Sequence, residues 1–171
     1  ILAVSGKVLP STDVALNLKA VYEDGSVVIG ESQIAYNALN KKIRSIAIEP
    51  EGAEALPEAV SEIEKAKVII IGPGSLYTSL MPNLLIGGIK DAIIKSAALK
   101  IYICNVITQP GETDNYSAYD HLKVITSILG ERSIDYIVVS DVTNASDVLL
   151  AKYRASRAEP VKIDIEKIAA L

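Results

Sequence analysis

The sequence has little cysteine and little aromatic variety. Its 171 residues include one cysteine, Cys104, no tryptophan and no phenylalanine, and its aromatic residues are eight tyrosines. A single cysteine excludes a disulfide framework and a zinc site built from several thiolates. A reducing, cytoplasmic location is therefore expected. The sequence also lacks any apolar run near the ~20 residues that a membrane helix needs, so we expect no membrane partner.

An excess of charge of one sign is also missing. Seventeen Lys and Arg residues stand against twenty-one Asp and Glu residues, which gives a net charge of −4. Because no stretch is densely basic, a nucleic-acid partner is not expected. Half of the residues are hydrophobic and 22% are charged, as in a globular protein, and the length suffices for one domain with a core.

The chain starts with Ile1 and an apolar stretch, ILAVSGKVLP, which lacks the charge asymmetry of a signal peptide. We expect the chain to be a piece of a longer protein with further residues upstream.

The first part of the chain has the pattern of an antiparallel hairpin. Residues 14–31 contain two alternating segments, ALNLKAVY and SVVIGE, on either side of Asp24-Gly25. An Asp-Gly pair between alternating segments is a strong hairpin signal. Residues 43–49, IRSIAIE, predict a further strand.

After residue 56, helical and strand patterns alternate. Helices are predicted from Pro57, along the stripe from Leu85 to Ala97, from Ser117 to Gly130, and after Asn144 as a cap. Ser117 and Asp120 have the spacing of a capping box. Strands are predicted at 67–71, 100–105, 134–140 and 161–165.

This alternation predicts an α/β fold with a mostly parallel sheet between two layers of helices. The strand segments VIII and YIVV are apolar on both faces, as in parallel strands that are covered on both sides. We expect one domain over 1–171, with the hairpin 14–31 as an antiparallel excursion from a parallel part at 43–165.

Ligands of such sheets bind beyond the carboxyl ends of the strands. The connections expected there are residues 72–83, 105–117 and 140–146. These connections therefore contain the candidate functional residues.

The connection 72–83 can form an anion site. Two glycines let the backbone come close to a ligand and point successive amides inward, and three hydroxyls add donors. These candidates are Gly72, Gly74, Ser75, Thr78 and Ser79. An ordinary tight turn from strand to helix explains the same residues equally well, so both interpretations stay open.

The connection 105–117 is long for its kind and rich in hydrogen-bonding side chains. Asn105, Thr108 and Gln109 are candidates for lining a ligand site. Glu112 and Asp114 could hold Mg²⁺ through oxygen ligands, although a solvated pair of acids is the favoured interpretation. No residue set for a metal site is therefore assigned.

His121 and Cys104 are weaker candidates. His121, the only histidine, is available for acid–base chemistry, but a hydrogen bond within a half-buried helix face is the commoner role. Cys104 ends an apolar strand and fits a small core residue better than a nucleophile. No catalytic residue is assigned.

Two long motifs resemble a known family. KVIIIGPGSLYTSLMPNLLIGGIKDAI and KIYICNVITQPGETDNYSAYDHLKVI resemble the bacterial gluconeogenesis factor (UPF0052) proteins, which are related to the 2-phospho-L-lactate transferases (CofD) of coenzyme F420 biosynthesis. VLPST and EDGSVVIGES look like the same family. The resemblance extends over nearly all of residues 3–162.

The resemblance implies a three-layer α/β/α, Rossmann-like fold that binds nucleotide compounds. The transferase branch uses a nucleotide-activated phospholactate, a deazaflavin acceptor and Mg²⁺. The gluconeogenesis-factor branch, which this sequence resembles more, is associated with UDP-sugar binding, cell shape and growth on gluconeogenic carbon sources, without an established reaction. Whether the chain is an enzyme stays open, and no cofactor is assigned beyond Mg²⁺ for a transferase.

One departure from the family pattern is large. Family members begin with a glycine-rich GGGTG segment, which these residues lack. The chain therefore resembles a C-terminal part without its N-terminal nucleotide-binding part, and it should expose the sheet face or edge that the other part covers.

The resemblance favours a small-molecule, UDP-sugar-binding protein. The alternative is a transferase that moves a phospho-organic acid from a nucleotide carrier. A third interpretation is an interaction module that docks a partner or a second copy through the hairpin, which leaves the oligomeric state open.

Overall fold

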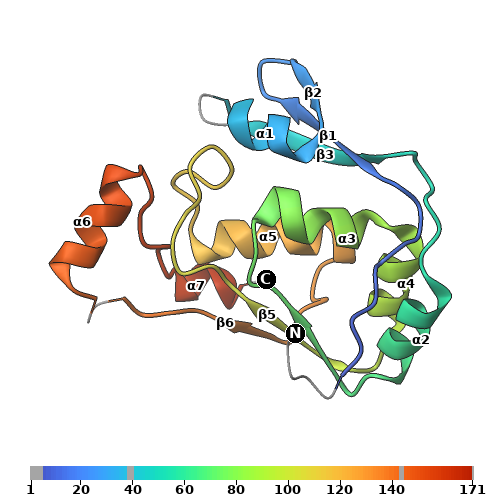
Figure 1. The fold of residues 1–171 in the computed structure, drawn as a ribbon. Helices are drawn as coiled ribbons and strands as arrows, with labels where there is room; N and C mark the ends of the chain where they lie inside the picture. Colours follow the sequence, from blue (N-terminus) through green and yellow to red (C-terminus); the bar gives the residue numbers. More distant parts are fainter. Residues whose placement is uncertain (1–5, 38–40, 143–144, 171) are drawn as a thin grey trace.

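The computed structural model describes residues 6–37, 41–142 and 145–170. Within this part, two three-stranded sheets and the helices around them form the molecule (Figure 1). The strands are β1 (Asn17–Tyr22), β2 (Val27–Ile29), β3 (Ile43–Glu49), β4 (Val68–Ile71), β5 (Leu99–Ile103) and β6 (Tyr136–Val138). The helices are α1 (Glu31–Asn37), α2 (Pro57–Lys65), the π-helix η2 (Leu76–Leu80), α3 (Met81–Leu85), α4 (Gly87–Lys95), α5 (Ala118–Leu129), α6 (Asp147–Ala155) and α7 (Ile165–Ile168).

The predicted hairpin is confirmed. β1 and β2 pair antiparallel with Val21 opposite Val27, and Gly25 lies in the turn at a φ of 81°. The Asp24 carboxylate accepts a hydrogen bond from the Ser26 amide at 2.9 Å, which closes the turn. The Asp-Gly pair therefore acts as the sequence predicts.

The strand at 43–49 belongs to the antiparallel sheet, so its assignment to the parallel part is wrong. β3 pairs antiparallel with β1, and Ala20 stands opposite Ile46. Ile43, Ile46 and Ile48 are buried, while other residues of β3 are exposed. One buried and one exposed face suit an edge of an antiparallel sheet better than a strand covered on both sides.

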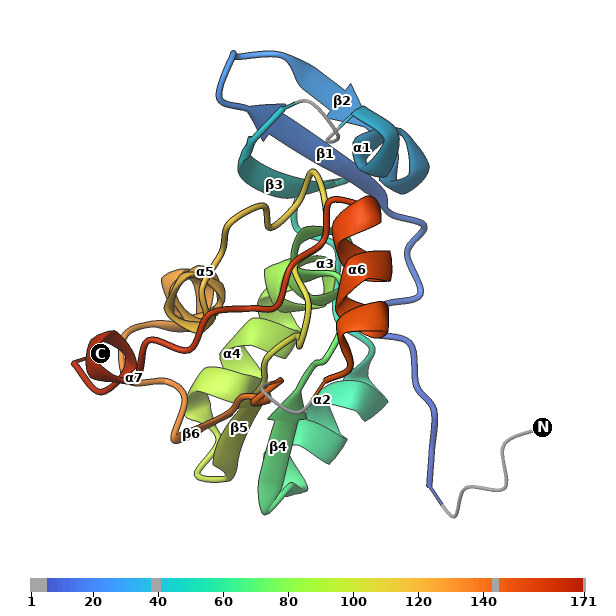
Figure 2. The same cartoon turned by 90° about the vertical axis from the view of Figure 1, so that its left-hand side faces the viewer.

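The parallel sheet has the order β4-β5-β6, as the alternating pattern predicts. Ile70 stands opposite Ile101, and Ile101 stands opposite Tyr136. The alternate residues point toward the core, where Ile71 and Tyr102 are buried. α4 connects β4 to β5 and α5 connects β5 to β6, and both helices lie on this buried side (Figure 2).

The helical segment after β4 begins earlier than predicted. We expected it to start near residues 83–85, but the backbone becomes helical at Leu76 in η2 and continues in α3. An extended Ile86 (φ −71°, ψ 113°) then separates α3 from α4. Ile89 and Ile93 of the predicted stripe are buried in α4. The periodic stripe therefore located the second half of this segment and missed its first turn.

The helix predicted from Ser117 to Gly130 is confirmed as α5, including its capping box. The Ser117 hydroxyl accepts from the Asp120 amide, and the Asp120 carboxylate accepts from the Ser117 amide at 2.9 Å. Gly130 ends the helix at a φ of 99°. Pro57 also stands in the first turn of α2, as predicted.

The C-terminal strand predicted at 161–165 is wrong. In this region Pro160 and Lys162 form isolated bridges with Ile107 and Ser117, and α7 begins at Ile165. Single bridges form because this segment lies against a loop and a helix start, which offer no strand to pair with.

Two other predictions near the C-terminus need adjustment. The strand expected at 134–140 is reduced to the three residues of β6. The cap of α6 is Ser146, whose hydroxyl accepts from the Leu149 amide, whereas the predicted cap Asn144 lies outside the described residues.

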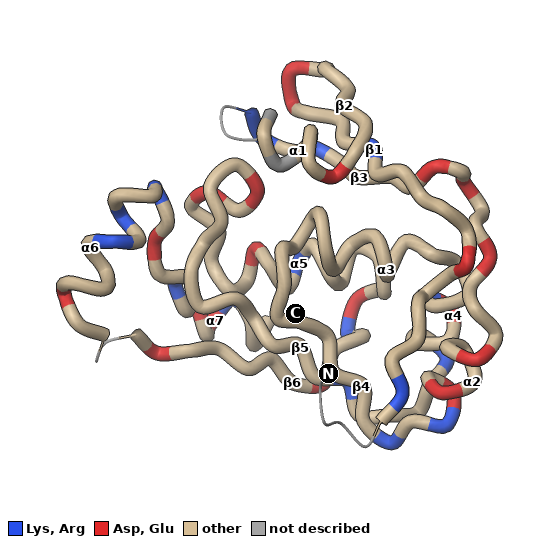
Figure 3. Tube along the Cα trace, in the orientation of Figure 1, with Lys and Arg blue, Asp and Glu red and all other residues tan. Residues whose placement is uncertain are grey.

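The α/β class is confirmed, with one parallel and one antiparallel sheet. The three-layer, Rossmann-like arrangement stays a prediction. None of the described helices is long and apolar enough to cross a membrane. Acidic and basic residues are dispersed over the trace (Figure 3).

Candidate functional site

The two connections that contain the predicted site residues lie side by side at the carboxyl ends of β4 and β5. Asn105, which follows β5, forms two hydrogen bonds with Gly74, which follows β4. Its Oδ1 accepts from the Gly74 amide at 3.3 Å, and its Nδ2 donates to the Gly74 carbonyl at 2.9 Å. The Asn105 side chain therefore fixes the glycine segment to the neighbouring strand.

Gly72 is required by packing against the next strand. Its φ is 84°, and a Cβ atom built there would lie 2.7 Å from the Ile103 carbonyl oxygen. Both facts exclude a side chain, because real Cβ atoms do not approach backbone oxygen so closely and seldom adopt this φ. The glycine is thus explained by the close approach of two strands without reference to a ligand.

Glu112 lies at the centre of the two connections and is 3% exposed. Its carboxylate accepts hydrogen bonds from the Tyr77 amide at 3.1 Å, the Thr78 hydroxyl at 2.9 Å and the Gln109 side-chain amide at 2.8 Å. Burial raises the pKa of the carboxyl, and the hydrogen bonds from Thr78 and Tyr77 oppose this rise. Glu112 therefore joins the first turn of η2 to the 109–113 turn.

The sequence predicts that the amides and hydroxyls of the 72–83 segment are free to bind an anion, and these contacts leave only some of them free. The Gly74 and Tyr77 amides, the Thr78 hydroxyl and the side chains of Asn105 and Gln109 already have partners within the protein. The Ser75 and Ser79 hydroxyls have no hydrogen-bond partner among the described residues. These two serines are the predicted donors that remain available to a ligand.

Thr108 is directed away from this junction. Its hydroxyl accepts from the Glu159 amide at 2.9 Å, and its own amide donates to the Glu159 carbonyl at 2.7 Å. It is 6% exposed. Thr108 therefore connects the 105–117 segment to the C-terminal segment at Glu159.

The two acids considered for Mg²⁺ do not converge. The Asp114 carboxylate is exposed and accepts from the Gly111 amide, whereas Glu112 is buried among its three donors. Over residues 6–37, 41–142 and 145–170, no group of three or more His, Cys, Asp or Glu side chains is placed to share one metal ion. These residues therefore do not form a magnesium site by themselves.

Buried Tyr77, partly buried Tyr116 and buried His121 form a row that the sequence did not predict. The hydroxyls of Tyr77 and Tyr116 are 2.8 Å apart, and the rings of Tyr116 and His121 meet edge to face at 5.5 Å. Tyr77 and Tyr116 each lie within one of the two motifs of the sequence, but nothing in their spacing indicates that they meet.

His121 is fully buried, where we expected a half-buried position. Its Nδ1 lies 2.9 Å from the Ser117 carbonyl oxygen, which can only accept, and its Nε2 has no partner in the described structure. Burial lowers the pKa of the imidazole, although Asp120 partly opposes this. His121 is therefore a neutral residue of the core.

Cys104 is a core residue, as expected. It is 3% exposed, and burial raises the pKa of its thiol to about 11. A thiol with such a pKa is protonated at neutral pH and is a weak nucleophile.

A small hollow borders the junction at Thr78. Its volume is about 200 Å³, and it lies between η2, the start of α3 and the antiparallel sheet. It is lined by Leu16, Asn17, Leu18, Gly30, Glu31, Ile48, Thr78 and Pro82. The antiparallel sheet thus contributes one wall next to the predicted site.

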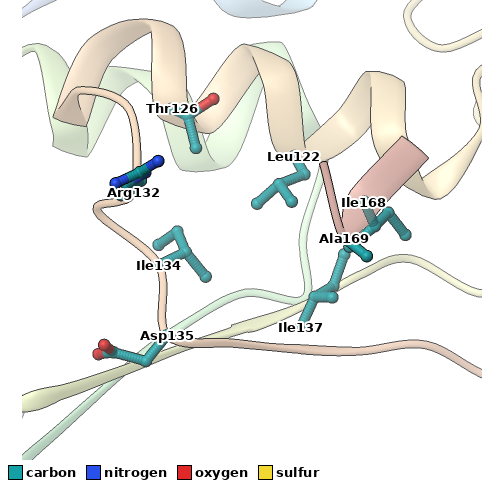
Figure 4. Close-up of a pocket in the computed structure, with 8 residues that line it drawn as sticks. All are labelled: Leu122, Thr126, Arg132, Ile134, Asp135, Ile137, Ile168 and Ala169. Carbon is teal, nitrogen blue, oxygen red and sulfur yellow. The ribbon is translucent and has the colours of Figure 1, made fainter. Parts of the chain in front are cut away.

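A second hollow of about 230 Å³ lies under α5 at the opposite edge of the parallel sheet (Figure 4). Ile134, Asp135 and Ile137 line it, and they surround the start of β6, whereas the predicted ligand residues follow the ends of strands. Leu122, Thr126, Arg132, Ile168 and Ala169 complete its wall. This hollow is therefore separate from the candidate site.

A family model described as 2-phospho-L-lactate transferase CofD matches residues 1–171. The chain belongs to the CofD family. Among curated CofD-family relatives, the gluconeogenesis factor of Halalkalibacterium halodurans is 47% identical over 171 residues, which cover 100% of this chain and 52% of the relative. The gluconeogenesis factor of Bacillus subtilis is 45% identical over 171 residues, or 100% of this chain and 53% of the relative.

A solved CofD-family structure agrees with the fold. The crystal structure of a UPF0052 family protein from Bacillus halodurans is similar with a TM-score of 0.91 and 47% identity, over 98% of this chain and 53% of that chain. The resemblance to the gluconeogenesis factors is therefore confirmed. The chain spans about half the length of the curated relatives it matches.

Proposed function

We propose that this chain is part of a gluconeogenesis-factor-type protein that binds a nucleotide sugar, of the UDP-sugar class, at the carboxyl ends of β4 and β5. As in the family resemblance, such a protein would act in the cytoplasm, in carbon metabolism and cell shape. The observation that carries the proposal is the junction of the 72–83 and 105–117 segments through Asn105 and Glu112. Two polar segments held together at this rim suit a ligand with several hydrogen-bonding groups.

The local backbone supports this location. Residues 76–80 form a π-helical turn shortly after β4, which ends at Ile71, and such turns occur frequently at functional sites. Gly72 and Gly74 bring the backbone close to the rim, and Ser75 and Ser79 supply hydroxyls for the phosphate or sugar. In this proposal Thr78, Asn105 and Gln109 hold the segments in place, and Thr108 supports the wall from behind.

The direct test is isothermal titration of the full-length protein with UDP-N-acetylglucosamine. We expect measurable binding, and a Ser75→Ala variant should bind at least about tenfold more weakly, since one hydrogen bond to a charged group contributes about 1.5 kcal/mol or more. The matched control is Ser61→Ala in α2, which should bind as the parent does. No heat at millimolar ligand with a folded protein would count against the proposal, as would equal affinities of the two variants.

The family model favours a second candidate, a transferase that moves a phospho-organic acid from a nucleotide carrier. In that reaction the nucleotide is the leaving group, and a magnesium ion would balance its charge. Glu112 is already occupied by three donors, so the metal ligands would come largely from outside the described residues. Nucleotide release by the full-length protein, measured with Mg²⁺ and an acceptor alcohol, would distinguish turnover from binding alone.

A further inference from the structure

The hollow at Thr78 lies where the antiparallel sheet meets the candidate site. The antiparallel sheet and α1 lie over the segment formed by η2 and α3 (Figure 1). Thr78 belongs to both places, because its side chain lines the hollow and its hydroxyl donates to Glu112 at 2.9 Å. A ligand group that enters the hollow therefore contacts the antiparallel sheet while the rest of the ligand lies at the junction after β4 and β5.

Two polar side chains on the antiparallel side of the hollow are free to bind a ligand. Asn17, at the start of β1, and Glu31, at the start of α1, both line the hollow and are exposed. Neither side chain has a hydrogen-bond partner among the described residues. Next to them, Leu18 and Ile48 form an apolar wall. A carboxylate and an amide beside an apolar wall can bind a ring that has both hydroxyl groups and C–H faces.

The position of Glu31 is fixed by the residues around it. Gly30 has a φ of 101°, and its amide donates to the Leu18 carbonyl at 2.7 Å. The amide of the fully buried Ile34 donates to the Gly30 carbonyl at 2.9 Å, and the Tyr22 hydroxyl donates to the Ile34 carbonyl at 3.2 Å. The backbone that carries Glu31 is therefore already ordered before a ligand binds, which lowers the entropy cost of binding.

The charge of the hollow favours a neutral group over a phosphate. The described residues that line it include one acid and no lysine or arginine. Burial is the main cause of the raised pKa of Glu112, and the negative charge of Glu31 adds to it, so the two carboxylates interact across Thr78. A phosphate in the hollow would be repelled by both carboxylates. The phosphates of a nucleotide sugar therefore fit at Ser75 and Ser79, and a neutral ring fits in the hollow.

We infer that the hollow at Thr78 binds the sugar ring of the nucleotide sugar, and that Glu31 is a specificity residue that accepts hydrogen bonds from the hydroxyls of the sugar. Asn17 adds a donor and an acceptor, and Leu18 and Ile48 pack against the C–H face of the ring. This inference rests on the proposed function, because the phosphates are placed at the serines after β4.

The size of the hollow agrees with one ring. Its volume is about 200 Å³, which is below the ~300–1,000 Å³ of pockets that enclose a whole drug-sized ligand. A complete nucleotide sugar does not fit inside it, whereas a single sugar ring does. The antiparallel excursion thus has a function in this inference, since it supplies the side chains that recognise the sugar.

The test compares UDP-N-acetylglucosamine with UDP by isothermal titration of the full-length protein. We expect the parent to bind UDP-N-acetylglucosamine more tightly than UDP. Glu31→Ala should weaken UDP-N-acetylglucosamine binding about tenfold or more, because hydrogen bonds to a charged acceptor are lost, and should leave UDP affinity within about twofold. Glu31→Gln keeps the shape and one acceptor oxygen without the charge, so its affinity should lie between those of the parent and Glu31→Ala.

The matched control is Glu51→Ala, which removes an exposed glutamate that does not line the hollow and should bind both ligands as the parent does. Equal affinities of Glu31→Ala and Glu51→Ala for UDP-N-acetylglucosamine would overturn the inference while the proposed function stands. Equal weakening of UDP and UDP-N-acetylglucosamine by Glu31→Ala would also overturn it, since the hollow would then bind the nucleoside. A folded parent that binds neither ligand would overturn the proposed function and this inference with it.

Discussion

At the scale of single residues, Glu112 connects the segment after β4 to the segment after β5. Its carboxylate contacts the backbone of η2, the Thr78 hydroxyl and the Gln109 side chain, and it is almost inaccessible to solvent. Removing such a group leaves buried donors without partners, which is costlier than losing an exposed hydrogen bond. Its role depends on segments 35 residues apart, so the sequence alone indicated only a solvated or metal-binding acid.

We predict that Glu112→Ala lowers the free energy of unfolding by about 2–3 kcal/mol, because the hydrogen bonds of a buried charged group are lost. Chemical denaturation would measure it, with the exposed Glu131→Ala as the control. Formate, which can occupy the vacated carboxylate position, should restore part of the loss in Glu112→Ala and none in the control. A loss below 0.5 kcal/mol, an estimate typical of surface sites, would show that Glu112 does not join the two segments.

Gly72 gives a second prediction at this scale. Gly72→Ala places a Cβ atom 2.7 Å from the Ile103 carbonyl oxygen at a φ of 84°, so it should destabilise the protein by about 2 kcal/mol or more. Gly87→Ala is the matched control, since no atom lies within 4 Å of its Cβ position, and its effect should stay within about 0.5 kcal/mol. Thermal unfolding of both variants would check this, and similar melting temperatures would contradict it.

At the scale of secondary structure, local signals predicted the elements that form through local contacts. The Asp24-Gly25 turn and the Ser117–Asp120 capping box involve residues within three positions of each other, and both were predicted. The strand at 161–165 was wrong because a strand also needs a partner, and pairing depends on distant residues. The assignment of β3 to the parallel part was wrong for the same reason.

The candidate site divides in the same way. The sequence predicted that the segments after β4 and β5 meet, because the carboxyl ends of parallel strands share one edge. It did not predict that Asn105 and Glu112 occupy donors of the other segment, since this depends on the packing of side chains. The sequence also did not predict η2, because its five residues show no helical periodicity of apolar residues.

The N-cap serines of α5 and α6 should differ in how much they contribute to the stability of the protein. Ser117 caps α5, which buries six residues, whereas Ser146 caps α6, which buries none. We expect Ser117→Ala to lower the global free energy of unfolding by about 1 kcal/mol, and Ser117→Gly by only a few tenths. Ser146→Ala should change it by less than about 0.3 kcal/mol, because α6 can unfold locally.

Denaturant titration would measure the three variants, and hydrogen exchange would show local opening of α6 in Ser146→Ala. Equal global losses for Ser117→Ala and Ser146→Ala would contradict the difference in packing between the two helices.

At the scale of the whole molecule, the stability should depend on pH through buried groups. His121 has a pKa below its ordinary value of 6.5 because it is buried, so the unfolded chain takes up its proton first. Stability from this residue is present above pH 6.5 and is lost as the pH falls from 6.5 toward the lowered pKa. Glu112 acts oppositely, since its raised pKa removes stability as the pH increases above 4.5.

We predict that His121→Gln flattens the decrease in unfolding free energy below pH 6.5, because glutamine can donate to the Ser117 carbonyl without titrating. Denaturant unfolding between pH 5 and 8, compared with the parent as the reference, would measure the difference that belongs to His121. Parallel pH curves for the parent and the variant would contradict this prediction, because they would show that folding does not change the pKa of His121.

The single thiol of these 171 residues has a further use. Cys104 is held in the core of the parallel sheet and is protonated at neutral pH. An alkylating reagent can therefore modify it only while the core around Cys104 is open. The rate of that alkylation therefore reports how often the core opens. It can be measured in a cell extract without attaching a label to the protein beforehand.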